Sequence, residues 1–277
     1  MRPGIAVSTL LALWFAGATA ATSDGEYLFN AAGCLACHTS EGGPALAGGR
    51  AFTTPYGVFY SPNITPDPDT GIGRWSREQF INALKQGTAP DGKAYYPVFP
   101  YTSYRLMTDQ DAGKIFDYLQ TRAPMPQPNR EHDLPWWLSR WLMKPWQWWV
   151  LEAPPAAPSD AELARGRYLV DALGHCGECH TPRNLAGISD LGRYLGGTLN
   201  GPDDEKVPNI TPHRDDGIGK WDADDLGYFL EAGELPNGDY TGGLMTEVID
   251  NGTSKLNDSD RRAIVRYLRS VEPKPGP

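Results

Sequence analysis

The sequence is poor in the residue types that most often carry chemistry, and poor in long apolar runs. Its 277 residues include only four cysteines and five histidines. Positive charge is also scarce, since 25 Lys and Arg face 34 Asp and Glu, for a net charge of −9. This balance argues against nucleic acid or an anionic membrane surface as the main partner. With 40% hydrophobic and 21% charged residues, the chain is globular, and it is long enough for two domains.

The one long apolar run stands at the N-terminus. Arg2 is followed by an apolar run over residues 5–18 and by small residues at 18–20. This order predicts a secretory signal peptide, residues 1–20, cut after Ala20. An uncleaved membrane anchor is the alternative, although the run is shorter than the ~20 residues of a comfortable span. We therefore expect an exported protein of the periplasm, either soluble or membrane-associated.

All the cysteines stand in two short motifs, "CLACH" and "CGECH". They are Cys34, Cys37, Cys176 and Cys179. C-x-x-C-H is the attachment signature of a c-type haem, in which both thiols bond to the haem and the adjacent histidine binds the iron as proximal ligand. A thioredoxin-like pair or half of a zinc site would use the same spacing, but two pairs that are each followed by histidine favour haem. The motifs predict two covalently bound haem c groups, with His38 and His180 as the proximal ligands.

The motifs belong to an internal repeat. Residues 61–87 match residues 207–233 at a constant offset of 146 (209 − 63 for the paired asparagines), and the motif histidines are offset by 142 (180 − 38). The repeat predicts two homologous haem domains. Their limits are residues 21–123 and 159–277, and a Pro- and Trp-rich segment, residues 124–158, joins them.

Each copy of the repeat is predicted to be helical. Apolar residues at helical spacing predict one helix before each motif and one that closes each copy. These four helices cover residues 23–33, 108–121, 159–174 and 257–270. Between them, Ser76 and Asp222 are suited to begin the middle helices, and Gly87 and Gly233 to end them. The expected fold class is all-α, with two tandem class I cytochrome c-like haem domains.

The order C-x-x-C-H, P-N-I-T, G-I-G-x-W, a methionine-bearing loop and a final helix with "YL" resembles that of dihaem c-type cytochromes. It is similar above all to the cytochrome c subunits of membrane-associated bacterial dehydrogenases of the periplasm, of the alcohol, gluconate and aldehyde type. Multihaem cytochromes paired with aldehyde- or N-heterocycle-oxidising molybdenum enzymes are also similar. The best-known members carry three haem motifs, whereas this chain has two. The resemblance implies a dehydrogenase electron donor and a cytochrome or oxidase acceptor as partners.

The sixth ligand of each iron is expected from the loop that follows each middle helix. Met245 follows a flexible "YTGGL" segment and is the predicted axial ligand of haem 2, and the resemblance points to the same residue. The repeat offset places Phe99 at this position in the first copy (245 − 146), and a phenyl ring cannot bind iron. The offset of the closing helices places Tyr96 there (245 − 149), so neither register supplies a methionine. Met107 is the nearest replacement and is the predicted axial ligand of haem 1, although it aligns with Leu256, where a core residue is expected. An open or water-ligated iron is the alternative. More remote candidates are Met125, Met143 and His132.

Six of the nine tryptophans lie in the segment of residues 124–158. They are Trp136, Trp137, Trp141, Trp146, Trp148 and Trp149. The middle of this segment is too aromatic for a solvated linker. Three interpretations stay open: packing between the haem domains, a docking surface for a partner dehydrogenase, and peripheral membrane contact through residues 136–149.

These features predict an exported dihaem cytochrome c that relays single electrons from a partner dehydrogenase to another cytochrome or a terminal oxidase. No Ser/His/Asp set, paired carboxylates or phosphate loop accompanies the haem motifs in the sequence. We therefore expect no catalytic residues of the chain's own. The alternative is a haem enzyme, peroxidase-like or thiosulfate-oxidising, that uses an open axial site on haem 1.

Overall fold

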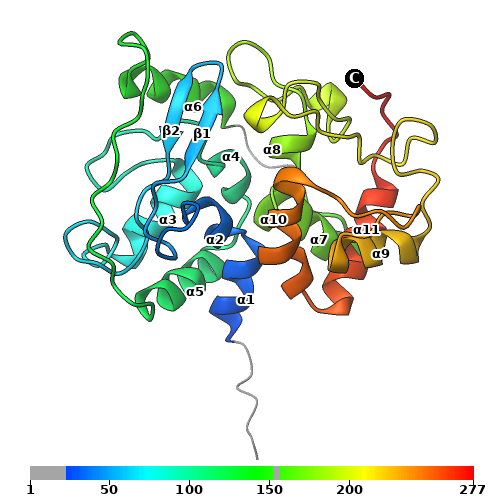
Figure 1. Cartoon of the computed structure of the whole chain (residues 1–277), viewed down its shortest axis with the longest axis horizontal. Helices are drawn as coiled ribbons and strands as arrows, with labels where there is room; N and C mark the ends of the chain where they lie inside the picture. The colour runs from blue at the N-terminus through cyan, green and yellow to red at the C-terminus, as the bar shows by residue number, and fades with distance from the viewer. Residues whose placement is uncertain (1–22, 152–155) are drawn as a thin grey trace, which may run out of the picture.

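A computed structural model describes residues 23–151 and 156–277. The predicted signal peptide, residues 1–20, lies outside this part of the chain. The described structure is mostly helical, with two groups of helices side by side and a single two-stranded hairpin (Figure 1). Within residues 23–151 and 156–277, no helix is both long and apolar enough to cross a membrane.

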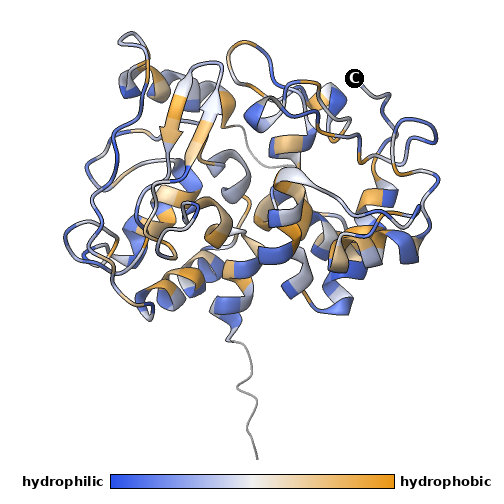
Figure 2. Cartoon of the chain, in the orientation of Figure 1, coloured by the Kyte–Doolittle hydropathy of each residue, from blue (hydrophilic) through white to orange (hydrophobic). Residues whose placement is uncertain are grey.

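The first copy of the repeat forms five α-helices. They are α1 (Asp24–Ala31), α2 (Cys34–Cys37), α3 (Arg77–Gln86), α4 (Tyr101–Tyr104) and α5 (Asp109–Gln120). The predicted start and end of the middle helix are confirmed, because Ser76 forms a capping box with Gln79 and Gly87 ends α3 in the left-handed conformation. Both α3 and α5 carry hydrophobic residues as well as hydrophilic ones (Figure 2), and in each helix part of the hydrophobic residues is buried in the core.

The second copy repeats this order of helices. Its elements are α7 (Ala161–Arg167), the π-helix η2 (Tyr168–Leu173), α8 (Gly177–His180), α9 (Ala223–Ala232), α10 (Gly243–Asn251) and α11 (Asp258–Ser270). Short 3-10 turns lie between them at η3 (Leu191–Arg193), η4 (Pro202–Asp204) and η5 (Thr253–Lys255). As predicted, Asp222 caps α9 and Gly233 ends it in the left-handed conformation.

A β-hairpin departs from the all-α expectation. Strand β1 (Ala51–Thr54) pairs antiparallel with β2 (Gly57–Tyr60), with Phe52 opposite Phe59. Gly57 has a φ of 124°, which a residue with a Cβ rarely adopts, so it allows the tight turn. The β-favouring residues Phe52, Thr53, Val58 and Phe59 explain the strands, and this ten-residue signal is too short to stand out beside the helical periodicities.

The Pro- and Trp-rich segment is folded onto the hairpin. It contains the turn η1 (Arg140–Leu142) and the helix α6 (Met143–Val150). Val58 of β2 pairs with Asp133 of the segment, and Met143 packs in a small buried cluster with Phe59 and Tyr96. The segment therefore forms one wall of the first copy.

The two copies meet through a pair of equivalent contacts. The Tyr27 hydroxyl donates to Asp260 Oδ2 at 2.6 Å, and the Tyr168 hydroxyl donates to Asp111 Oδ2 at 2.7 Å. Each tyrosine hydroxyl also accepts the N–H of the residue that caps the same helix. The acceptors Asp111 and Asp260 occupy the same position in α5 and α11 (260 − 111 = 149). Each copy thus binds the start of the other's closing helix, as in an isologous dimer interface.

Candidate functional site

The two cysteine motifs form single helical turns, α2 and α8, that lie in equivalent places in the two copies. Burial raises the pKa of the Cys34 and Cys176 thiols to about 12. This opposes a reactive dithiol, which needs a thiolate at neutral pH. In addition, no group of three or more His, Cys, Asp or Glu side chains able to hold a metal ion occurs among the described residues.

The motif histidines make the same hydrogen bond in both copies. The distance from Nδ1 to a proline carbonyl oxygen is 2.8 Å both for His38 with Pro62 and for His180 with Pro208. Because a carbonyl only accepts, Nδ1 carries the proton and Nε2 keeps a free lone pair. Burial lowers the pKa of both histidines, which keeps them neutral. This arrangement is the one that orients an imidazole for metal ligation.

The P-N-I-T segment also fastens the chain that follows the closing helix. In the first copy, Asn63 Nδ2 donates to the carbonyl of Met125 at 2.7 Å, and the Met125 N–H donates to Thr65 Oγ1 at 3.1 Å. The four-residue motif therefore supplies both the carbonyl for the histidine and a clamp for the chain leaving α5. Met125 is held at the clamp through its main chain.

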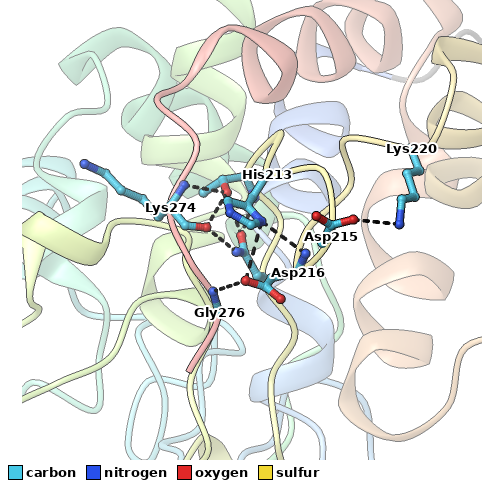
Figure 3. A network of polar contacts seen from close by, with 8 residues as sticks. His213, Asp215, Asp216, Lys220, Lys274 and Gly276 are labelled. Atoms are coloured by element: carbon cyan, nitrogen blue, oxygen red, sulfur yellow. Dashed lines mark hydrogen bonds and ion pairs between the residues drawn. The ribbon is translucent and has the colours of Figure 1, made fainter.

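The second copy repeats this clamp at the C-terminal end of the chain. Asn209 Nδ2 donates to the carbonyl of Lys274 at 2.6 Å, and the Lys274 N–H donates to Thr211 Oγ1 at 3.1 Å. Figure 3 shows Lys274 and Gly276 against the loop that contains His213 and Asp216. The Gly276 N–H donates to Asp216 Oδ2 at 3.2 Å. Lys274 is the counterpart of Met125 (274 − 125 = 149).

A cavity of about 370 Å³ opens beside the first motif. Cys34, Cys37 and His38 lie at its wall. The wall also includes residues of the hairpin, the loop of residues 61–75, α3, the loop before α4, Tyr104 of α4, Leu119 of α5 and the Pro- and Trp-rich segment. The lining is largely apolar, as a haem plane requires, with aromatic residues such as Phe59 and Phe99. The geometry therefore fits a haem attached at the two thiols.

One buried donor in this cavity lacks a partner. Arg140 Nη2 is buried and has no hydrogen-bond partner among the described residues, while Arg140 Nε donates to the carbonyl of Ala94 at 2.6 Å. Its guanidinium also lies 5.2 Å from the ring centre of Tyr95. A buried N–H donor without an acceptor is costly, and a haem propionate would satisfy Nη2. The cavity thus offers both an apolar wall and a cationic anchor for a haem.

The two predicted axial methionines, Met245 and Met107, differ in burial and position. Met245 lies in α10, is partly exposed and stands outside the buried core. Met107 is 2% exposed and belongs to the main core cluster, together with its repeat counterpart Leu256. Met107 does not line the cavity of the first motif, whereas Phe99 does.

The first motif is tied to the helix that carries Met245. Arg50 Nη1 donates to the carbonyl of Ala36, between the two cysteines, at 2.8 Å. The same guanidinium forms an ion pair with Glu247 of α10. Figure 1 shows α10 beside α2, and the two helices are in contact.

The second motif is tied to helix α4, which follows Phe99. Glu178, inside "CGECH", accepts hydrogen bonds from Thr102 Oγ1 at 2.7 Å and Ser103 Oγ at 2.6 Å, both in α4. Burial alone would raise the pKa of Glu178, but its ion pair with Arg183 and these hydroxyls lower it overall. A largely buried carboxylate, 13% exposed, therefore links the second motif to the first copy.

Most of the tryptophans in the segment are on the surface. Trp136, Trp141 and Trp148 are 94%, 86% and 90% exposed. Trp146 reaches the other copy, where its Nε1 donates to the carbonyl of Ala186 at 2.8 Å. Trp146 therefore fits the interpretation of the cluster as packing between the copies, whereas three highly exposed tryptophans leave apolar surface open to solvent.

Sequence reasoning missed two polar groups of the site, Arg50 and Glu178. It pointed to Arg140 only as a cation among tryptophans at an interface, and to His132 only as a remote axial candidate, whereas both line the cavity. Glu178 could have been noticed as the one charged residue inside a haem motif. Its partners could not, because the contacts join residues far apart in the chain.

The fold and the motifs together define a c-type cytochrome. Residues 22–123 match the family described as Cytochrome c. A "diheme cytochrome c-type" protein of Cereibacter sphaeroides is 43% identical over 267 residues, which cover 93% of this chain and 88% of that protein. The chain therefore belongs to this family of c-type cytochromes, whose members bind haem c covalently and serve in electron transfer.

Relatives named as dehydrogenase subunits are also similar. The gluconate 2-dehydrogenase cytochrome c subunit of Pantoea cypripedii is 42% identical over 90% of this chain and 59% of its own length. The fructose dehydrogenase cytochrome subunit of Gluconobacter japonicus is 40% identical over 91% of this chain and 53% of its own length. The chain thus spans less than two thirds of these subunits.

Proposed function

We propose that this chain is an exported dihaem cytochrome c that relays single electrons from a partner dehydrogenase to another cytochrome or a terminal oxidase. Its two haem domains would be residues 21–123 and 159–277, working in the periplasm. The observation that carries the proposal is the duplicated site: two Cys-x-x-Cys-His turns whose histidines make the same 2.8 Å bond to a proline carbonyl. The relatives named as dehydrogenase subunits support a dehydrogenase as donor.

The haems supply the one-electron chemistry, and the protein supplies their attachment and environment. Cys34 and Cys37 would hold haem 1, and Cys176 and Cys179 haem 2. His38 and His180 present Nε2 lone pairs because their Nδ1 protons are engaged by carbonyls. Met245 would be the axial ligand of haem 2. It lies outside the buried core, in α10, within the stretch where the sequence predicts this ligand.

Arg140 would hold a propionate of haem 1. Its Nη2 is a buried donor in need of an acceptor, and its Nε is already fixed by the Ala94 carbonyl. A charge-assisted bond to a carboxylate satisfies the donor and orients the haem in the cavity. The positive charge also favours the reduced haem, which carries one negative charge more than the oxidised haem.

The exposed aromatic surface formed by Trp136, Trp141 and Trp148 would be the contact for the dehydrogenase. Aromatic anchors with few charges are typical of interface centres, and this surface adjoins the haem 1 cavity because Arg140 lies beside Trp141 in the chain and lines that cavity. A membrane surface is the competing occupant, since tryptophans also gather at the level of lipid headgroups.

Haem counting tests whether the chain carries the two haems that the proposed relay requires. The alkaline pyridine haemochrome of the exported protein should show two haems per chain, and reductive titration should take up two electrons per chain. A variant with both Cys176→Ala and Cys179→Ala should keep one haem. One haem in the unaltered protein, or none, would refute the proposal.

A second experiment addresses the aromatic surface. The double variant Trp141→Ser and Trp148→Ser should lose reduction by the co-purifying dehydrogenase and its substrate, yet be reduced by dithionite as before. Binding to vesicles of neutral or anionic phospholipid is measured in parallel. Unchanged reduction by the dehydrogenase, with loss of vesicle binding, would assign the surface to the membrane instead.

A further inference from the structure

The distal side of the first haem site differs from that of the second at one residue. Phe99 occupies the loop position that Met245 holds in the second copy, and it lines the cavity of the first motif. Its ring packs edge-on against Tyr95 at 5.5 Å and Tyr104 at 5.9 Å between ring centres. These contacts keep the phenyl ring, which has no donor atom for iron, at the position where the other copy has a thioether.

No methionine of the described residues lines this cavity. Met107 is 2% exposed in the main core, and the Thr108 that follows it caps α5, so its backbone is fixed. Met143 is 7% exposed in the cluster behind the cavity wall, with Phe59. Met125 is clamped through its main chain by Asn63 and Thr65. Bringing Met107 or Met143 to the iron would require a buried core to open, and Met125 does not line the cavity.

The histidines are committed as well. His132 lines the cavity, but its Nδ1 accepts the Tyr60 N–H at 3.1 Å. The neutral ring therefore carries its proton on Nε2, which leaves no lone pair there for a metal. Burial lowers the pKa of His132, which maintains the neutral form. His175 is packed edge-on against Tyr104 and does not line the cavity.

We propose that haem 1 keeps its sixth coordination position available to an external ligand, whereas Met245 closes haem 2. The inference rests on the proposed dihaem function. The class of ligand follows from the wall, which is largely aromatic and aliphatic and includes Phe99 and Val98. With Arg140 engaged by a propionate, this wall favours small neutral ligands of ferrous haem over anions, because burying an unpaired charge is costly. Haem 1 would thus bind a neutral diatomic molecule such as carbon monoxide.

Carbon monoxide binding to the reduced holoprotein tests this directly. Haems are first counted by the pyridine haemochrome, so failure of the dihaem proposal would be recognised before the ligand is added. With two haems present, the expected result is one carbon monoxide per chain, with one methionine-to-iron charge-transfer band in the far red for the oxidised protein. No binding by the dihaem protein would overturn the inference.

Three variants assign the ligands. Phe99→Met should abolish carbon monoxide binding and add a second far-red band, because it restores the thioether of the second copy. Met107→Leu is the matched control, since the side chain is similar in size and the repeat itself has leucine there; binding and spectrum should not change. Met245→Leu should raise the stoichiometry to two. If Met107→Leu instead removes a far-red band or adds a binding site, Met107 is the ligand of haem 1 and the inference is wrong.

Discussion

Removal of the Tyr27 hydroxyl tests the contact that joins the two copies. In Tyr27→Phe the hydroxyl bond to Asp260 is lost, together with the bond from the exposed Asn257 N–H, while the ring stays. Asp260 is nearly buried, at 9% side-chain exposure, and also accepts two bonds from Arg165, at 2.8 and 2.6 Å. A hydrogen bond to a charged acceptor is worth about 1.5–3 kcal/mol. Because Arg165 still satisfies the carboxylate, we expect a loss at the low end, about 1–2 kcal/mol of unfolding free energy.

The carboxylate itself should contribute more. Asp260→Ala removes the bonds from Tyr27 and both bonds from Arg165. Breaking a buried ion pair costs about 3–5 kcal/mol, but Arg165 is 36% exposed, so solvent screening reduces the expected loss to roughly 2–3 kcal/mol.

The contact also predicts a pH dependence. Burial alone would raise the pKa of Asp260, but the bonds from Arg165 and Tyr27 lower it below its ordinary value of 3.8. A lowered carboxyl pKa stabilises the fold above the ordinary value and stops doing so as the pH falls through the lowered one. The difference between wild type and Asp260→Ala should therefore be full at neutral pH and shrink below about pH 4.

Urea unfolding of the holoprotein, followed by far-ultraviolet circular dichroism, measures these energies. Tyr168→Phe removes the equivalent bond to Asp111 and should cost a similar amount. Tyr240→Phe is the control, because its hydroxyl is on the surface and its contact with Glu234 is long, 3.4 Å. If Tyr27→Phe and Tyr168→Phe are as stable as Tyr240→Phe, the paired tyrosines do not hold the copies together.

Three further results are expected from the haem sites. Arg140→Gln should lower the midpoint potential of haem 1 in a redox titration and leave that of haem 2 unchanged. The potential should fall by roughly 60 mV for each tenfold loss in the preference of the site for the reduced over the oxidised haem. Equal shifts of both haems would contradict a local effect. Glu178→Gln should raise the potential of haem 2 and slow electron transfer between the haems after rapid reduction of one; an unchanged rate would show that its bond to Ser103 does not bear on transfer. Met245→Leu should remove the far-red band of haem 2, and its persistence would exclude Met245 as ligand.

Local signals account for the helices and motifs. Ser76, Asp222, Gly87 and Gly233 act within one helical turn of their own position, so the sequence around each is sufficient to predict where α3 and α9 begin and end. The contrast between Phe99 and Met245 follows from the repeat offset alone, because it needs only the alignment of the two copies.

Long-range contacts could not be predicted in the same way. Tyr27 and Asp260 are 233 residues apart, and nothing beside either residue indicates the other. Arg140 reaches the cavity only because the Pro- and Trp-rich segment folds back over the hairpin, and a composition rich in proline and tryptophan does not specify that path. The hairpin was missed because its strands are four residues each, close to the shortest that a pattern can identify.

Some contacts occur in both copies of the repeat, and other features occur in one copy only. Where the two copies make the same bond, as at the proline carbonyls or at Tyr27 and Tyr168, the bond positions a histidine or joins the copies. Where they differ, the first copy has Phe99 in place of a methionine, the hairpin, and a segment that brings Arg140 and exposed tryptophans. The second copy has the π-helix η2 and, in α10, a longer helix than α4. The elements of the first copy border its cavity, so they support our proposal that the first site exchanges with another molecule, whether an electron donor at the aromatic surface or a small ligand at the iron.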